Sequence, residues 1–489
     1  MATEFDFVVV SNRLPVDRID SGADKEEWSR SPGGLVAALE PVMRSENGAW
    51  VGWPGKSELK LDPFDFDGMH LVPLELTDRE VAEFYEGFSN DTLWPLYHDV
   101  IAAPSFHREW WETYRNVNLR FAKLVSKTAS QNGTVWIHDY QLQLVPKMLK
   151  ELRPDLTIGF FDHIPFPPYG LFSQLPWRVP IIEGVLGADV VGFQRDADAH
   201  NFMQAVRRLK GFPTKGTQIV VPQIDPNQGQ RVFAPIEIAG ESRTVIVRKF
   251  PISIDSDSFK TLSNSPEVRA RAKQIRGDLG NPKCVILGVD RLDYTKGIGH
   301  RLEAYRELLA ERKIDPKDTI LVQVASPSRE RVQSYVKLRD EIEVTIGRIN
   351  GDYSVIGHQA ISYHHHNYPK EETAALYLAA DVLLVTALRD GMNLVAKEFV
   401  ASRSDNDGVL VLSEFTGASD ELKKAILVNP HDIEGLKSAI LRATQMPKEE
   451  RTSRMKAMRK RVFENNVQKW SGEFLRELRA AKLRREPKH

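Results

Sequence analysis

The sequence predicts an α/β protein made of two doubly wound domains, each with a parallel sheet covered by helices. Short apolar runs rich in β-branched residues recur along the chain, and each is long enough for one buried strand. Segments with helical periodicity lie between these runs, an alternation that is typical of parallel sheets. Because the pattern occurs twice, we expect two domains of the same kind.

The first domain is predicted from five strand-like segments, at residues 5–11, 134–140, 157–164, 189–194 and 244–252. Helical periodicity lies between them, as in residues 33–45 and 117–130. We therefore assign residues 1–252 to an N-terminal Rossmann-like domain.

The second domain is predicted from a further set of strands, at residues 284–290, 319–326, 381–388, 408–415 and 425–432. Residues 300–313 and 433–446 have helical periodicity, and the join lies near residues 251–259. We assign residues 253–460 to a C-terminal Rossmann-like domain. Residues 461–489 contain a helix with an apolar stripe, which we expect to pack back on the N-terminal domain. Ligands of such domains lie at the carboxyl ends of the strands, so we expect the two domains to face each other across a cleft.

The composition excludes several classes of partner. Among the 489 residues, 66 Lys and Arg balance 67 Asp and Glu, so no net charge recruits nucleic acid or an anionic membrane. No segment has the length of a membrane span, and the first residues lack the features of a signal peptide. The single cysteine, Cys284, cannot form an intramolecular disulfide and favours a reducing compartment. We expect a cytoplasmic protein.

Charged residues follow the strand at 381–388, in the segment "LRDGMNLVAKEF". Asp390 and Gly391 stand where the strand ends and a helix begins, which is a ligand-facing position. The backbone N–H groups of the next residues, Met392, Asn393 and Leu394, would suit an anion, and Glu398 lies on the same helix face as Gly391. The alternative is that Asp390 only caps the helix and Glu398 is solvated.

Two cations follow the strand at 284–290, in "GVDRLDYTKG". Arg291 can bind a phosphate with two N–H groups and Lys296 can bind it as a point charge, so together they suit a nucleotide diphosphate. Surface ion pairs are the alternative. Arg329 follows the strand at 319–326 and is another cation at a strand end.

The first domain also carries polar and aromatic residues at its predicted loops. Arg13 ends the first strand, and Gly33-Gly34 begins a helix, but the dinucleotide fingerprint G-x-G-x-x-G is absent after that strand. Asp139 and His163 follow consecutive strands, which makes a functional role more credible than either residue alone would. Aromatic residues at loops suit a sugar ring, although single aromatics more often belong to a core; those in question are Trp53, Tyr85 and Trp94.

Metal binding is not expected. Three consecutive histidines, 364–366, cannot all converge on one ion in regular structure, and no cysteine pair or HExxH motif accompanies them. We therefore expect neither a metal nor a cofactor.

As a set, the motifs resemble the trehalose-6-phosphate synthases, retaining glycosyltransferases with two Rossmann-like domains of the GT-B type. The motifs occur in order over nearly the whole chain: "SNRLP", "GGL", "GWPG", "FSNDTLWP", "IHDY", "HIPFP", "LPWR", "GADVVGFQ", "RLDYTKG", "GRINGDY" and "LRDGMNLVAKEF". The resemblance implies that glucose passes from a nucleotide-diphosphate glucose to glucose 6-phosphate, giving α,α-trehalose 6-phosphate. The donor could be UDP-, ADP- or GDP-glucose, and we expect a homo-oligomer.

The resemblance also implies roles for individual residues. Arg291 and Lys296 match the cations on the donor diphosphate, and Gly34 matches the glycine loop that closes over it. Asp390 matches the carboxylate on the donor glucose hydroxyls, with Gly391 to Leu394 beside it, and Glu398 matches the one on the ribose. Asp139 and His163 match the pair beside the reacting centre, so the expected catalytic residues are Arg291, Lys296, His163 and Asp139. The acceptor positions are Arg13, Trp53, Tyr85, Trp94 and Arg329. One departure is Asp162, where an apolar residue is expected.

Retention without an obvious second carboxylate predicts a mechanism with no enzyme nucleophile. We expect attack on the same face of the donor, with the leaving diphosphate accepting the proton. Three alternatives remain: a pseudoglycosyltransferase that joins cyclitol units, a regulatory subunit without catalysis, and a dehydrogenase, which the missing fingerprint disfavours.

Overall fold

The structure is a computed structural model that describes residues 4–19, 27–31, 48–222 and 242–485, together with residues 36, 39 and 43. The chain divides into two compact units. The first contains the residues up to Pro251 and those from Trp470 onward, and the second contains Ile252–Lys469. No helix in the described ranges combines the length and the apolar character that a membrane span requires.

The first unit is built on a ten-stranded sheet. Its strands lie in the order β10 (Thr214–Lys215), β11 (Gln218–Pro222), β12 (Ser242–Lys249), β9 (Val190–Phe193), β8 (Thr157–Phe161), β7 (Ala129–His138), β1 (Phe5–Arg13), β4 (Ala49–Trp53), β6 (Met69–Pro73) and β5 (Phe64–Phe66). The strands from β12 to β6 are parallel, and the sheet ends in antiparallel pairs, β10 with β11 and β5 with β6. A separate hairpin joins β2 (Val16–Ile19) to β3 (Glu27–Arg30).

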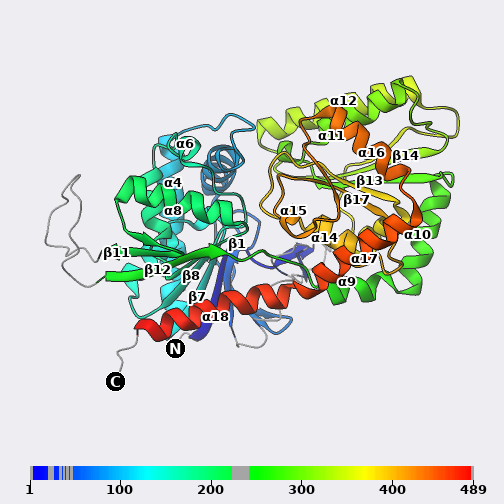
Figure 1. The fold of residues 1–489 in the computed structure, drawn as a ribbon. Coiled ribbons are helices and arrows are strands. Elements are labelled where there is room, and N and C mark those ends of the chain that lie inside the picture. Colours follow the sequence, from blue (N-terminus) through cyan, green and yellow to red (C-terminus); the bar gives the residue numbers. More distant parts are fainter. Residues whose placement is uncertain are drawn as a thin grey trace. The chain divides into compact units, whose positions relative to one another are not determined.

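Helices cover both faces of the first sheet (Figure 1). The helices from the first part of the chain are α2 (Asp78–Glu80), η1 (Val81–Leu93), α3 (Trp94–Tyr97), α4 (Arg108–Thr128), η2 (Tyr140–Leu142), α5 (Val145–Leu152), α6 (Tyr169–Phe172), α7 (Arg178–Val185) and α8 (Asp196–Lys210). The last helix, α18 (Val467–Arg485), crosses the face opposite to α4 and α8.

Glycines in the strands let α18 approach this sheet closely. A Cβ at Gly159 of β8 would lie 2.7 Å from the ring of Phe474, so a larger residue would displace the helix. The Phe474 ring stacks on Trp136 of β7 with a centroid distance of 4.4 Å. The C-terminal helix is therefore part of the hydrophobic core of the first unit.

The second unit has a six-stranded parallel sheet. Its strands lie in the order β15 (Ile361–His364), β14 (Thr319–Ser326), β13 (Cys284–Arg291), β16 (Val382–Val385), β17 (Val409–Ser413) and β18 (Ile426–Val428). The helices around it are α9 (Ser256–Ser263), α10 (Pro266–Asp278), η3 (Tyr294–Lys296), α11 (Ile298–Ala310), α12 (Gln333–Tyr353), α13 (Lys370–Ala379), α14 (Leu394–Ser402), α15 (Ala418–Glu421), α16 (Ile433–Thr444) and α17 (Lys448–Glu464).

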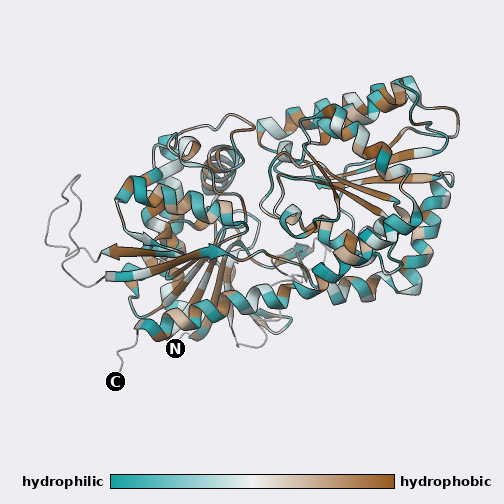
Figure 2. Ribbon diagram, in the orientation of Figure 1, coloured by the Kyte–Doolittle hydropathy of each residue, from teal (hydrophilic) through white to brown (hydrophobic). Residues whose placement is uncertain are grey.

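The predicted α/β class with two doubly wound sheets is confirmed. Most of the strand residues in both sheets are coloured as hydrophobic in Figure 2, whereas most helices show one hydrophobic and one hydrophilic side. This is the pattern of strands buried on both faces beneath amphipathic helices. In both sheets the strand order reverses beside the first strand, β1 or β13, and such reversal points are where ligands of open α/β sheets bind.

Candidate active site

In the second unit, the reversal point lies between β13 and its neighbour β16. Arg291 ends β13, Lys296 ends η3, and Asp390 follows β16. The Lys296 Nζ atom lies 2.6 Å from Asp390 Oδ2, and the two side chains are only 11% and 15% exposed. This pair is therefore no surface ion pair, because both groups sit largely out of water at the ligand edge of the sheet.

The turn that carries Lys296 depends on Gly297. Its φ of +63° lies in the left-handed region, and a Cβ there would approach the Thr386 carbonyl oxygen to 2.2 Å. Thr386 Oγ1 also lies 3.3 Å from the Gly297 carbonyl oxygen. The end of η3 is thus packed against the segment after β16, which fixes the position of Lys296 relative to Asp390.

A buried carboxylate, Asp293, organises the cations of this region. It accepts a hydrogen bond from Arg329 Nη1 at 2.8 Å, and its own side chain is fully buried. Burial acts to raise the pKa of Asp293, but the charges of Arg329, Arg291 and Lys296 together hold that pKa well below its usual range. Three cationic side chains thus lie near Asp293, and one of them, Lys296, also pairs with Asp390. A group of cations at the end of a strand suits an anionic ligand.

The loop after Asp390 is held by its own side chains and by the turn after β17. Asn393, rather than Asp390, caps α14: its side chain accepts a hydrogen bond from the Ala396 N–H at 3.1 Å. The Asn393 amide also donates to Asp390 Oδ2 at 3.2 Å. The Ala418 N–H donates to the Met392 carbonyl at 2.8 Å. As the first helical residue, Leu394 has an N–H group with no preceding turn to bond, which leaves a donor at the helix start.

Glu398 lies one turn into α14 and is only partly exposed to solvent. Tyr377, a fully buried residue of α13, donates a hydrogen bond to Glu398 Oε2 at 2.9 Å. Burial raises the pKa of Glu398, and the Tyr377 hydrogen bond partly offsets this effect. The carboxyl group is therefore held in one orientation at the edge of the site.

In the first unit, three of the predicted acceptor residues come together. The Arg13 guanidinium lies 5.4 Å from the centre of the Trp53 ring, and the Trp53 and Tyr85 rings are 5.9 Å apart. Arg13 also pairs with Asp17 at 2.6 Å. Gly55 makes room for this arrangement, because a Cβ there would lie 2.2 Å from Arg13 Nη2. An arginine beside two aromatic faces suits a charged sugar.

Trp94 lies in a separate aromatic group and is 4% exposed. Its ring centroid is 4.1 Å from that of His98 and 5.6 Å from that of Tyr140. Tyr140 in turn donates a hydrogen bond to the buried Asn90 at 2.7 Å. This group joins the helical segment that contains Tyr85 and Trp94 to the loop that follows Asp139.

Asp139 and His163 follow the neighbouring parallel strands β7 and β8. Asp139 has a φ of +78°, unusual for a residue with a side chain, and its Oδ1 accepts a hydrogen bond from the His163 N–H at 3.2 Å. Its own N–H donates to the Phe161 carbonyl at 2.7 Å. Burial lowers the pKa of His163 to about 3, so the imidazole is neutral at physiological pH.

Two of the predicted site residues, Gly34 and Arg329, are not placed beside the other predicted residues of their sites. Gly34 lies outside the described residues. Arg329 belongs to the second unit, where its side chain is 5% exposed and bound to Asp293, whereas Arg13 belongs to the first unit.

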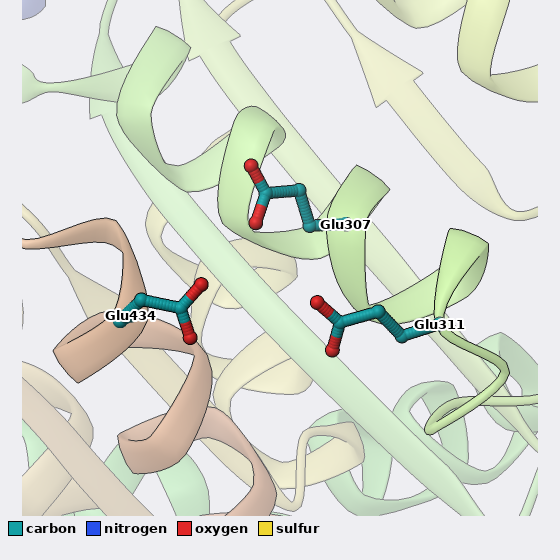
Figure 3. A group of neighbouring side chains, drawn as sticks. All are labelled: Glu307, Glu311 and Glu434. Carbon is teal, nitrogen blue, oxygen red and sulfur yellow. The ribbon is translucent and has the colours of Figure 1, made fainter.

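The histidines at 364–366 do not share a common point. His364 bonds Tyr368 at 3.0 Å through Nδ1, whereas Nδ1 of His365 bonds the Ala325 carbonyl at 2.8 Å. Among the described residues, only Glu307, Glu311 and Glu434 are spaced as metal ligands could be (Figure 3). The Lys437 Nζ atom, however, bonds all three, at 2.9 Å from Glu307 and 2.8 Å from Glu434. A lysine ammonium therefore already lies among these three carboxylates and bonds each of them.

Three residues that contact predicted site residues were not themselves predicted from the sequence. Asp293 binds Arg329, Tyr377 binds Glu398, and His138 lies against His163. The D-x-T spacing of Asp293 and Thr295 signals a capped turn, and the structure has it: Asp293 accepts from the Thr295 N–H at 2.9 Å. His138 precedes Asp139 directly in "IHDY". Nothing in the sequence around Tyr377 indicates its contact.

Known proteins are similar to this chain over nearly all of its length. Residues 5–480 match the model of glycosyltransferase family 20. The chain is 54% identical over 476 residues to a trehalose-6-phosphate synthase of Mycolicibacterium gilvum, covering 96% of this chain and 93% of that one. It is 31% identical to a Burkholderia xenovorans α,α-trehalose-phosphate synthase (UDP-forming) in complex with glucose-6-phosphate, with a TM-score of 0.85 and coverage of 97% and 99%. It is also 31% identical to an E. coli protein bound with UDP-2-fluoro glucose, with a TM-score of 0.85 and coverage of 96% and 98%.

Proposed function

Because the chain belongs to glycosyltransferase family 20, we propose that it transfers glucose from a nucleotide-diphosphate glucose to glucose 6-phosphate, forming α,α-trehalose 6-phosphate. The resemblance noted in the sequence is confirmed at this level: the chain is a glycosyltransferase of the trehalose-6-phosphate synthase type. Its two Rossmann-like domains are those of the GT-B class. The particular donor, the roles of the residues and the mechanism are the parts that we propose.

The observation that carries the proposal is the cation cluster at the ends of β13 and β14. Arg291, Lys296 and Arg329 gather around the buried carboxylate of Asp293, at the strand ends where nucleotides bind in such sheets. A diphosphate needs several fixed donors with positive charge, and guanidinium groups bind phosphate oxygens in pairs. The E. coli relative that binds UDP-2-fluoro glucose supports UDP-glucose as the first donor to test, ahead of ADP- and GDP-glucose.

The donor site is assigned to residues that follow β13 and β16. Arg291 and Lys296 bind the diphosphate, and Asp390 binds hydroxyls of the transferred glucose. Glu398 binds the ribose, which its fixed orientation against Tyr377 supports. The segment from Gly391 to Leu394 supplies backbone donors near the start of α14, and Gly34 is assigned to the loop that closes over the diphosphate.

The acceptor site is assigned to Arg13, Trp53, Tyr85, Trp94 and Arg329. Arg13 is the clearest of these, because its side chain is 44% exposed and lies beside an aromatic ring. We assign the phosphate of glucose 6-phosphate to Arg13 and Arg329, and the sugar ring to the aromatic residues. The Burkholderia xenovorans relative in complex with glucose-6-phosphate supports this choice of acceptor.

The mechanism that we propose uses no enzyme nucleophile. The acceptor hydroxyl attacks the anomeric carbon on the face from which the diphosphate leaves, so the α configuration is retained. The bond from that carbon to the diphosphate oxygen breaks, and a diphosphate oxygen takes the hydroxyl proton. Arg291 and Lys296 stabilise the developing charge, and Asp139 and His163 position the glucosyl group, so catalysis rests on positioning and electrostatics.

Two further expectations accompany the proposal. We place the enzyme in the cytoplasm, since its single cysteine, Cys284, is a buried free thiol that suits a reducing compartment. We also expect a homo-oligomer, which light scattering of the purified chain measures directly.

The first test is nucleotide diphosphate release from UDP-, ADP- and GDP-glucose, with and without glucose 6-phosphate. We expect release that depends on the acceptor and one preferred donor. Binding of a donor without release would favour the regulatory-subunit alternative, and release with a cyclitol acceptor only would favour the pseudoglycosyltransferase.

A further inference from the structure

His138 has no part in the mechanism described so far, yet it lies directly beside the proposed site. It is the last residue of β7 and is fully buried. Its Nδ1 atom lies 3.1 Å from Nε2 of His163, and the two rings stack with centroids 5.3 Å apart. One of these nitrogens therefore carries a proton and the other accepts it in a hydrogen bond.

Aromatic rings lie against both histidines, while the carboxylate of Asp139 binds the backbone of His163. The His138 ring is 4.8 Å from that of Trp136, and the His163 ring is 4.6 Å from that of Phe161 and 6.2 Å from that of Trp470. Burial lowers the pKa of both histidines, with a further contribution to His138 from His163 itself. Both rings are thus neutral, and each carries one N–H group.

The direction of the hydrogen bond follows from the other nitrogen of His138. Its Nε2 atom is buried and has no hydrogen-bond partner among the described residues. If His163 donated the shared proton, His138 would carry its own proton on Nε2, as a buried N–H group without an acceptor. Buried donors of this kind are rare and costly, more so than an unpaired acceptor. The favoured arrangement therefore has His138 donating from Nδ1 to Nε2 of His163.

We propose that His138 is a positioning residue that fixes His163 in its Nδ1–H form, so that His163 offers a donor, not an acceptor, to the ligand. When one nitrogen of a neutral imidazole accepts a hydrogen bond, the proton of the ring must lie on the other nitrogen. The end of β7 then holds His163 twice, since the Asp139 carboxylate binds its backbone N–H at 3.2 Å.

This assignment deepens the proposed function and rests on it for the identity of the ligand. With its proton on Nδ1 and its Nε2 occupied by His138, His163 has no free lone pair to act as a general base. It can donate a hydrogen bond to an oxygen of the glucosyl donor. That role agrees with a reaction in which the leaving diphosphate takes the proton of the acceptor.

The direct test is the protonation state of His163 in the full-length protein. Long-range proton–nitrogen spectra of the chain labelled with [¹⁵N]histidine distinguish the two neutral forms, and His163→Gln identifies the signals of His163. We expect a protonated Nδ1 and a bare Nε2, unchanged between about pH 6 and pH 8, well above the pKa of about 3. A proton on Nε2, or on both nitrogens, would overturn the proposal.

A pair of substitutions tests whether the hydrogen bond matters for turnover. His138→Asn keeps an N–H donor close to the position of Nδ1, whereas His138→Leu fills the space without a donor. We expect kcat of His138→Leu to fall about 10- to 100-fold, with the KM for glucose 6-phosphate unchanged and substantial rescue in His138→Asn. Equal losses in both variants at equal melting temperatures, or full activity of His138→Leu, would contradict it.

The two proposals can fail separately. If the wild-type chain releases no nucleotide diphosphate from any donor, the proposed function is wrong, while the spectra of His163 still decide the position of its proton. Should His138→Leu fail to fold, the spectra and the His138→Asn variant remain as tests.

Discussion

The ammonium of Lys296 lies 2.6 Å from a carboxylate oxygen of Asp390, between residues that follow neighbouring strands of one sheet. Each group neutralises the charge of the other, and both side chains have little access to water. The pair also receives a hydrogen bond from Asn393 to the same Asp390 oxygen at 3.2 Å. If Lys296 and Asp390 have the roles proposed above, these contacts hold the phosphate-binding cation and the sugar-binding carboxylate in fixed positions, which lowers the cost of organising the transition state.

The first prediction concerns the two donor cations. Lys296→Met and Arg291→Ala should each lower kcat about 100-fold or more, because the charge that develops on the leaving diphosphate loses a fixed partner. Lys283→Met is a matched control, since this lysine is 79% exposed and pairs only with Asp318 in the described structure. Steady-state kinetics of donor and acceptor measure the effect. A loss confined to the KM for glucose 6-phosphate would contradict the assignment.

The second prediction concerns the acceptor phosphate. Arg13→Ala should raise the KM for glucose 6-phosphate about 10- to 100-fold, the range expected for losing a charged hydrogen bond. Slow hydrolysis of the donor in the absence of acceptor should remain, because Arg13 does not touch the donor in this account. Asp17→Asn is the control, since it removes the partner of Arg13 and leaves Arg13 itself. If Arg13→Ala impaired donor hydrolysis equally, the role would be wrong.

The third prediction concerns Asp162, which follows β8 and is 1% exposed. Burial and the nearby charges of Asp139 and Asp198 raise its pKa well above the usual range. The folded state thus holds a proton that the unfolded chain releases near pH 4, so the contribution of Asp162 to stability falls as pH rises above that value.

Asp162→Asn keeps the shape of the neutral acid but cannot ionise, so its contribution to stability does not fall with rising pH as that of Asp162 does. We expect the variant to gain free energy of unfolding relative to wild type at pH 8, by about 1.4 kcal/mol for each unit by which the pKa is raised, and to lose this advantage toward pH 4. Paired denaturant titrations of the variant and the wild type at pH 4, 6 and 8 measure this difference in the free energy of unfolding. An advantage that did not change with pH would show that Asp162 has an ordinary pKa.

The fourth prediction concerns the acidic cluster of Figure 3. Hydrogen bonds to Glu311, Glu434 and Glu307 raise the pKa of Lys437, whose side chain is 3% exposed. Lys437→Met should lower the melting temperature, because three carboxylates between α11 and α16 would lose their common cation. Millimolar Ca²⁺ should stabilise this variant and leave wild type unchanged, since an oxygen-rich cluster would then be vacant.

Lys313→Met is the control for the fourth prediction. This lysine pairs with Glu311 alone at 2.7 Å and is 52% exposed, so its loss should have little effect. If Lys437→Met melted at the same temperature as the wild type, the stability of the protein would not depend on the contacts of Lys437 with these carboxylates.

Much of the fold could be predicted because strands buried on both faces need continuous apolar runs. The run at 319–326 became β14 with the predicted bounds, and the run at 425–432 became the shorter β18 (Ile426–Val428), because polar residues follow it. The antiparallel edges, such as β10 with β11, were not predicted. The edge strand β10 has only two residues, Thr214 and Lys215, and so short a polar segment does not differ in composition from a loop.

Site residues could be predicted where polar residues follow a strand directly. Their contact partners could not be predicted where those partners come from separate elements of the fold. Asp139 and His163 stand at consecutive strand ends, and the structure brings them into contact. The capping role considered for Asp390 falls instead to Asn393, because Asn393 directly precedes Leu394, the first residue of α14. The contact of Tyr377 with Glu398 joins separate helices, and no local pattern reveals such a pair.

The most direct test of the account is the structure of the sugar formed by the wild-type enzyme. NMR of the product made from ¹³C-labelled UDP-glucose and glucose 6-phosphate reports the linkage and both anomeric configurations. We predict a 1,1 linkage with both centres in the α configuration, which means retention at the donor carbon. A β configuration at that carbon, or free glucose as the only product, would contradict the proposed reaction.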